Sequence, residues 1–177
     1  MCIRGRLRRG VAGGSRDARA HHQLGFALIS LGRYSEAVAS LSRATALEPR
    51  NPAHLAQIAM AYERLRRDDM ARKMAEAAIA LDPRHALALT QLARLDLLSG
   101  DLDGAERRAR AAVESASDPA LTGSALHTLG RIAEKRGDHA GAFDAHMRAN
   151  RFRASSPAAR RMAGEARALI DEAAWYT

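Results

Sequence analysis

The seven histidines of this chain are the residues best suited to metal binding or proton transfer. His139 and His146 lie seven residues apart, so a helix would carry both on one face. No carboxylate is placed to complete a zinc shell with them. The single cysteine, Cys2, excludes an intrachain disulfide and a cysteine-based metal site. We therefore expect neither a metal site nor a cofactor.

Motifs that would carry catalysis are missing as well. The sequence holds no His-Glu-x-x-His, no Gly-x-Ser-x-Gly and no glycine-rich phosphate loop ending in lysine. The glycines within 10–14 follow no predicted strand, and Lys73 and Lys135 are the two lysines of the chain. Because no nucleophile is paired with a base, we expect that this chain is not an enzyme.

The net charge of +8 is concentrated at the two ends of the sequence. Residues 1–20 hold six arginines against one aspartate, and residues 148–167 hold six arginines against one glutamate, which leaves residues 21–147 neutral. Basic ends can bind polyanions without specificity. The other interpretation is a disordered arm over residues 1–17 and the polar face of a terminal helix near the C-terminus.

No membrane or secretion segment is predicted. The sequence has no run of about 18 apolar residues, which a transmembrane helix would need. The arginines near the N-terminus are followed by Val11-Ala12-Gly13-Gly14 and not by the apolar core of a secretion signal. We expect a cytoplasmic protein without a membrane partner.

The elements that must position any binding residues repeat along the chain. The pattern Gln-[Leu/Ile]-[Gly/Ala] begins at Gln23, Gln57 and Gln91, with 34 residues from one copy to the next. A looser copy at Thr128-Leu129-Gly130 comes three residues late. Such a period indicates a stack of identical helical units, and an Ala-, Leu- and Arg-rich composition with few aromatic residues favours helix. The pattern predicts units over 18–51, 52–85, 86–119 and 123–156.

Each unit is expected to hold two antiparallel helices. In the first, Leu24, Ala27, Leu28 and Leu31 should be buried, and Gly32 should end the first helix. The second helix should bury Tyr34, Ala37, Leu41 and Ala44 and stop before Pro49. Ser155-Ser156-Pro157 reads as the start of a last helix, over 157–177, that caps the stack.

These units resemble the tetratricopeptide repeat (TPR) family. The resemblance covers about 18–156 and rests on apolar, small, aromatic and proline residues at the family's positions. In the first two units these include Leu24, Gly25, Gly32, Tyr34, Ala37, Ala44 and Pro49, and then Ala59, Tyr62, Ala71, Ala78 and Pro83. In the third and fourth units they include Gly100, Ala105 and Ala112, and then Leu129, Gly130, Gly137 and Ala142. It implies an all-α, right-handed solenoid. In it, the small eighth residue of each unit should face the twentieth residue, where the two helices cross.

The chain departs from the family's pattern at a few positions. Arg66 stands where the turn glycine belongs, Asp96 stands at a tyrosine position, and Asp118-Pro119 comes late, which predicts a loop over 115–120. His139 and His146 occupy positions at which the family has packing aromatic residues, so both histidines are expected to be structural. Phe143 occupies a core position and is expected to be buried.

The resemblance implies a concave groove lined by the first helix of each unit. The residues expected there are Arg19, His22, Gln23, Phe26, Gln57, Met60, Arg64, Gln91, Arg94, His127, Thr128, Arg131 and Lys135. The sixth residues, Gln23, Gln57, Gln91 and Thr128, form a row of hydrogen-bonding side chains that could hold an extended peptide.

The ninth residues change from apolar to cationic along the groove: Phe26, Met60, Arg94, Arg131. We expect the partner to be a protein or peptide with an apolar end and an acidic or C-terminal carboxylate end. Alternatively, the glutamines satisfy neighbouring helices and the arginines pair with Glu63, Asp96 or Glu134. Self-association is also possible.

The last unit carries a narrower resemblance, through Leu129-Gly130, Gly137-Asp138, Ala142-Phe143 and Arg148-Ala149-Asn150, to the final repeat of bacterial TPR-sulfotransferases. Residues 157–177 would correspond to the linker that leads into their catalytic domain. The sequence therefore predicts a scaffold that binds a peptide or protein. The alternatives are the TPR region of such an enzyme without its catalytic domain and a polyanion or nucleic-acid binder through the basic ends.

Overall fold

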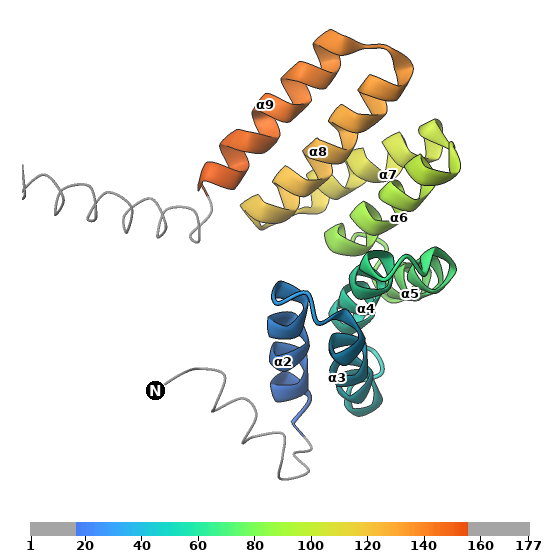
Figure 1. Ribbon diagram of the computed structural model, residues 1–177, viewed down its shortest axis with the longest axis vertical. Coiled ribbons are helices and arrows are strands. Elements are labelled where there is room, and N and C mark those ends of the chain that lie inside the picture. The colour runs from blue at the N-terminus through green and yellow to red at the C-terminus, as the bar shows by residue number, and fades with distance from the viewer. Residues whose placement is uncertain (1–16, 156–177) are drawn as a thin grey trace, which may run out of the picture.

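The computed structural model describes residues 17–155, which are helical throughout apart from short turns. The basic arm expected over 1–17 and the capping helix expected over 157–177 lie outside the described residues, except for Asp17. The helices, coloured from blue to orange in Figure 1, are α2 (Ala18–Ser30), α3 (Tyr34–Leu47), α4 (Pro52–Arg64), α5 (Asp68–Leu81), α6 (Ala86–Ser99), α7 (Leu102–Ser115), α8 (Pro119–Arg136) and α9 (His139–Ser155).

Consecutive helices pack as pairs, α2 with α3, α4 with α5, α6 with α7 and α8 with α9, and the pairs follow one another along the long axis of the molecule (Figure 1). The first helices also touch one another in order, α2 to α4, α4 to α6 and α6 to α8. Among the described helices, the second members of the pairs make no such contacts. The first helices therefore form the closed, inner row of an all-α solenoid, as predicted, and the second helices spread apart on the outside.

The turn within each pair depends on one residue with left-handed backbone geometry. Gly32, Gly100 and Gly137 have φ values of 73°, 88° and 78°, which glycine adopts without steric cost. Arg66 occupies the same place between α4 and α5 with φ 59°, and among the described residues it is the one non-glycine residue with positive φ. The chain thus keeps the turn where it has lost the glycine.

Side-chain caps start the inner helices. The carboxylates of Asp17 and Asp118 and the side-chain oxygen of Asn51 accept hydrogen bonds from backbone N–H groups two residues later, at 2.9, 2.8 and 3.1 Å. Asp118 with Pro119 in the first turn starts α8 directly. The predicted loop over 115–120 is therefore too long, since α7 continues to Ser115 and α8 already includes Pro119 and Ala120.

The core of each pair is a close crossing between two helices. A Cβ on Gly25 would lie 2.5 Å from Cγ of Leu41, and a Cβ on Gly130 would lie 2.5 Å from Cε1 of His146. The eighth residue of the unit therefore packs against the twenty-fourth at these two crossings. In the third unit the eighth residue, Ala93, shares an apolar cluster with the twentieth, Ala105. The twentieth residue of the first unit, Ala37, is fully buried, as predicted.

The two middle pairs have alanine at both positions of this crossing. Ala59 and Ala75 lie in one apolar cluster, and Ala93 and Ala109 lie in another. The two end pairs thus have a glycine beside a large residue at the crossing, and the two middle pairs have alanine beside alanine.

Two residues expected in the core are exposed instead. Leu31 is 45% exposed because it follows the last turn of α2 as its C-cap, where no second helix covers it. Phe143 is 69% exposed because it lies on the side of α9 that no described helix covers. Leu28, Leu41 and Ala44 are buried as predicted.

Asp96, at the tyrosine position of the third unit, is buried in α6 and joins three helices. Its Oδ1 accepts a hydrogen bond from Nη1 of Arg72 on α5 at 2.8 Å, and its Oδ2 pairs with Arg108 on α7. A buried carboxylate needs such compensation. An ion triad therefore takes the place that an aromatic side chain would fill here.

Replacing Arg66 with glycine should raise the free energy of unfolding by about 1 kcal/mol, because left-handed geometry costs a residue with a Cβ roughly 1–2 kcal/mol. Urea denaturation followed by circular dichroism measures the change. The control is Arg107→Gly at an exposed position within α7. That variant should lose roughly 0.5–1 kcal/mol, as glycine does within helices. A loss of stability in both variants would contradict the argument.

Replacing Gly25 with alanine should lower the free energy of unfolding by about 1–3 kcal/mol, because Leu41 is fully buried and cannot move away. Leu41→Ala alone should cost about 2–5 kcal/mol through the cavity it leaves. The double variant recreates the alanine pair of the middle crossings, so it should be no less stable than Leu41→Ala. If the two losses of stability simply add in this double-mutant cycle, the sizes of residues 25 and 41 do not constrain each other, which contradicts the argument.

Candidate functional site

The inner row of first helices encloses a cavity of about 490 Å³ between α4, α6 and α8. Its lining combines charged, polar and small residues. It is lined by Arg64, Arg94, Ala120, Gly123, Ser124, His127, Thr128 and Arg131. Five of these, Arg64, Arg94, His127, Thr128 and Arg131, are predicted groove residues, and the structure brings them together from three helices.

The cavity holds more positive than negative charge. Nη2 of Arg94 donates to Oε1 of Glu63 at 2.5 Å, which links α6 to α4, and both side chains are mostly buried. No carboxylate within residues 17–155 pairs with Arg64 or Arg131. One of the two predicted arginines therefore has an acidic partner, as the alternative interpretation holds, and the other does not.

Arg64 and Arg131 are both close enough to Arg94 to affect its pKa. Burial lowers the pKa of Arg94, Glu63 raises it, and the charges of Arg64 and Arg131 lower it further. Arginine stays protonated all the same. The mutual repulsion of the three cations would be relieved by an anion in the cavity.

The row of sixth residues is not continuous at the surface. Gln23 is exposed and Gln57 is half-buried, whereas Gln91 and Thr128 are both only 2% exposed. Oγ1 of Thr128 donates to the backbone oxygen of Ser124 at 3.1 Å. The expectation that four sixth residues hold a peptide is therefore wrong for Gln91, whose position against the neighbouring helices removes it from solvent. Thr128 reaches only the wall of the cavity.

Other predicted groove residues lie at the two ends of the inner row. Phe26 on α2 is 56% exposed, and Met60 on α4 is half-buried. Arg19 on α2 and Lys135 on α8 are exposed. Along the inner row, α2 therefore carries the exposed Phe26 and Arg19, and α4, α6 and α8 carry exposed and half-buried cations.

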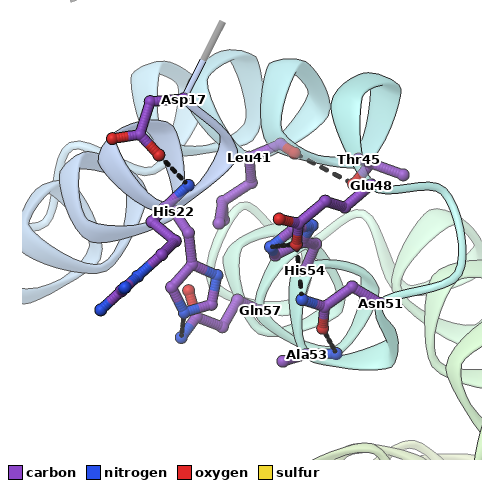
Figure 2. Close-up of polar contacts among 10 residues, drawn as sticks. Asp17, His22, Leu41, Thr45, Glu48, Asn51, Ala53, His54 and Gln57 are labelled. Carbon is purple, nitrogen blue, oxygen red and sulfur yellow. Dashed lines mark hydrogen bonds and ion pairs between the residues drawn. The ribbon is translucent and has the colours of Figure 1, made fainter.

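A pair of histidines joins α2 to α4 at the apolar end. The rings of His22 and His54 are 4.9 Å apart between centroids, and Nε2 of Gln57 lies 3.4 Å from Nε2 of His22 (Figure 2). Glu48 lies 3.8 Å from Nε2 of His54. The Nδ1 atoms of both histidines are buried and have no hydrogen-bond partner in the part of the chain that the structure describes.

The neutral form of both histidines is favoured there. Burial lowers the pKa of His22, and Glu48 only partly opposes it. Burial likewise lowers the pKa of His54, with a further decrease from His22 and a partial increase from Glu48. The sequence analysis places His22 in the groove but does not identify His54 as its partner.

A second histidine pair adjoins the cavity. The rings of His127 and His146 are 4.8 Å apart, and Nε2 of His146 lies 3.1 Å from Oε1 of Glu134. His146 also packs against Gly130. The sequence predicts that His146 is a packing residue and His127 a groove residue. In the structure the rings of these two residues lie next to each other. Ala120 and Gly123, which widen the cavity, are missed because small side chains give no functional signal.

Residues 17–155 offer neither a metal centre nor a membrane span. No three histidine, cysteine or acidic side chains in that range come together as metal ligands would. None of the helices described is both long and apolar enough to cross a membrane.

Comparison with protein-family models identifies the first two helix pairs. The model of the tetratricopeptide repeat matches residues 18–51, and a second model of the same description matches residues 55–85. Residues 18–51 and 55–85 are tetratricopeptide repeats. The first range is the predicted first unit, and the second lies within the predicted second unit. That the TPR units number four stays a prediction, as does the sulfotransferase resemblance.

Solved structures show the same TPR fold. TTC0263, a thermophilic TPR protein of Thermus thermophilus, is 19% identical with a TM-score of 0.71, over 90% of this chain and 86% of that one. MamA from Desulfovibrio magneticus RS-1 is 21% identical with a TM-score of 0.62, over 85% and 84%. The Sgt2 TPR domain from Aspergillus fumigatus is 23% identical with a TM-score of 0.59, over 68% and 80%. No curated protein sequence matches the chain.

Acid should destabilise the fold through His22 and His54. Their pKa values are lowered from 6.5 in the folded protein, so the folded state binds fewer protons than the unfolded state. Their contribution to stability is complete above pH 6.5 and is lost as the pH falls from 6.5 towards the folded pKa values. Thermal unfolding at pH 8 and pH 5.5 should therefore give a lower Tm at pH 5.5.

The double variant His22→Gln/His54→Gln should reduce this difference in Tm. The control is His139→Gln, at an exposed position at the start of α9. It should keep the wild-type difference. The same difference in all three proteins would show that the pair does not sense pH.

Proposed function

We propose that this protein is an interaction scaffold that binds a peptide or a segment of a partner protein along its concave face. One observation carries the proposal: three guanidinium groups from α4, α6 and α8 line one cavity, and of the three only Arg94 is paired with a carboxylate within residues 17–155. Guanidinium groups bind carboxylates through paired, charge-assisted hydrogen bonds. The cavity suits an acidic side chain or the C-terminal carboxylate of the partner.

The polarity of the inner row supports one direction of binding. Phe26 and Met60 lie on α2 and α4, and the cations of the cavity lie on α4, α6 and α8. An extended peptide would place an apolar side chain near Phe26 and its acidic end in the cavity. Exposed aromatic side chains are common anchors in protein interfaces.

The TPR fold supports a role in binding and not in catalysis. We propose that the protein is not an enzyme and that it works in the cytoplasm, on the sequence grounds given above. Binding of polyanions through the basic ends and membership of a TPR-sulfotransferase are not favoured by any contact within residues 17–155.

Arg64 and Arg131 are the residues to change, because Arg94 also neutralises the buried Glu63. The probe is a fluorescein-labelled peptide with phenylalanine near its N-terminus, several glutamates and a free C-terminal carboxylate. Each of Arg64→Ala and Arg131→Ala should weaken binding about tenfold or more, since a hydrogen bond to a charged group contributes roughly 1.5–3 kcal/mol. Fluorescence polarisation measures the affinity.

The matched control is Arg107→Ala, which removes the same charge from the exposed surface of α7. It should bind the peptide as the wild type does. An equal loss in Arg107→Ala would mean that net charge alone attracts the peptide, which contradicts the proposal. A C-terminally amidated peptide and one with glutamine for glutamate show which carboxylate the cavity binds.

A further inference from the structure

We infer that this protein binds further copies of itself end to end, with the outer face of α9 in one copy packed against the outer face of α2 in the next. The partner is a second copy of this chain, and the two surfaces in contact are different, so the contact can repeat from copy to copy. The inference does not depend on the proposed function, because these surfaces lie at the ends of the stack and the cavity lies between α4, α6 and α8.

Both ends of the described stack expose large apolar side chains. Helices α2 and α9 lie at opposite ends (Figure 1), and among the described helices α9 packs against α8 alone. Phe143 and Met147, four residues apart on one face of α9, are 69% and 42% exposed, and Leu31 at the end of α2 is 45% exposed. Terminal units of solenoid proteins need polar outer faces to remain soluble as single copies. Within residues 17–155, neither end has such a face.

The α2 end also has a hollow that an apolar side chain could enter. It has a volume of about 210 Å³ and lies between α2 and α3. Leu24 and Leu28 line it from α2, and the residues that line it from α3 are Glu36, Ala39, Ser40 and Arg43. Leu31 is one turn further along α2 than Leu28. The exposed leucine and the hollow therefore belong to one surface.

The contacts between successive pairs within the chain follow one register. Arg72 on α5 pairs with Asp96 on α6, and Glu106 on α7 pairs with Arg136 on α8. Arg72 and Glu106 are both the twenty-first residue of a predicted unit, whereas Asp96 and Arg136 are the eleventh and fourteenth residues of the following unit. The twenty-first residue of a unit therefore faces the next unit at its eleventh and fourteenth residues.

The first junction has apolar residues at the same positions. Val38 on α3 is the twenty-first residue of the first unit, and Tyr62 and Leu65 are the eleventh and fourteenth residues of the second. All three are half-buried. The junctions within the chain thus hold either charges of opposite sign or apolar side chains at this register.

A second copy that continues the stack would bring apolar residues together at this register. Phe143 is the twenty-first residue of the last predicted unit, and Leu28 and Leu31 are the eleventh and fourteenth residues of the first. Phe143 of one copy would therefore meet Leu28 and Leu31 of the next, beside the hollow. Removal of these side chains from water favours the contact, and no charge at any of the three positions opposes it.

A second copy accounts for more of the exposed surface than the segment that follows α9. Residues 157–177, which the sequence predicts to cap the stack, would cover Phe143 and Met147 but would leave the α2 end open. One contact between copies covers the α9 end of one and the α2 end of the other. It would also join the inner rows of successive copies into one longer row.

Sedimentation velocity of the full chain over a wide range of concentration tests the inference. The wild type should form dimers, trimers and longer species in turn as the concentration rises, because a contact between different surfaces that does not close into a ring repeats. Leu31→Lys and Phe143→Lys each place a charge in the junction, so each should remain a monomer throughout. Both replace exposed side chains, and circular dichroism checks that the variants are folded.

A mixture of the two variants separates this contact from a symmetric one. Leu31→Lys keeps a normal α9 end and Phe143→Lys keeps a normal α2 end, so one junction can form between them. At a second junction two lysines would meet and repel each other. The mixture should therefore stop at a dimer, with twice the mass of either variant alone.

The matched control is Met70→Lys, which replaces an exposed apolar side chain on α5, away from both ends. It should assemble as the wild type does, and equal loss of assembly in this variant would mean that apolar surface in general drives association, against the inference. Arg64→Ala and Arg131→Ala should also assemble normally, whether or not they bind peptide.

A wild type that remains a monomer at every concentration would overturn the inference. If Phe143→Lys then also had a lower Tm, residues 156–177 of the same chain would be the cover of that side chain. Assembly of the wild type that ends at a dimer, or a mixture of the two variants that remains monomeric, would likewise exclude the end-to-end contact.

Discussion

The crossing of the two helices in each pair is the constraint on which the rest of the structure depends. Gly25 meets Leu41 and Gly130 meets His146 at distances that leave no room for a Cβ. At the middle pairs, alanines take both places, Ala59 with Ala75 and Ala93 with Ala109. In both cases at least one small side chain stands at the crossing, which lets the two helices approach closely. A regular spacing of pairs is what allows the first helices to form one continuous inner row.

The inner row, in turn, determines where polar groups can be buried. Helix α6 packs between α4 and α8 and against α5 and α7, and most of its residues are buried, including Thr90, Gln91 and Asp96. The ion triad of Asp96 with Arg72 and Arg108 ties α6 to α5 and α7, and the pair of Arg94 with Glu63 ties it to α4. Ion pairs of this kind add little net stability, but they are costly to break and they fix the relative position of the helices. Helix α6 contributes Arg94 to the cavity, and most of the remaining lining residues come from α8.

Much of the fold could be predicted from the sequence because its signals are local. The period of 34 residues, the turn glycines and the small residues at the crossings determine helix pairs, turns and the inner row. What failed depends on contacts between units. The sequence identifies Gln91 as a groove residue from its place in the unit, yet burial by neighbouring helices removes it from solvent. Leu31 and Phe143 are apolar residues at helix positions that no described neighbour covers.

The charge of the candidate site was predictable, but the sequence left open which of its arginines pairs with an acidic residue. Arg94 and Arg131 appear equivalent in the sequence, since both are ninth residues of a unit, and the structure gives them different roles. Arg94 is held by Glu63, with most of its surface buried, so it acts mainly as a positioning residue between α4 and α6. Arg131 and Arg64 have no acidic partner within residues 17–155 and keep their charge available to a ligand. Removing Arg94 would leave the carboxylate of Glu63 buried without its ion-pair partner and would destabilise the fold. A loss of binding in such a variant would therefore not distinguish damage to the fold from loss of a ligand contact. The arginines without a partner are therefore the ones whose removal reports on recognition alone.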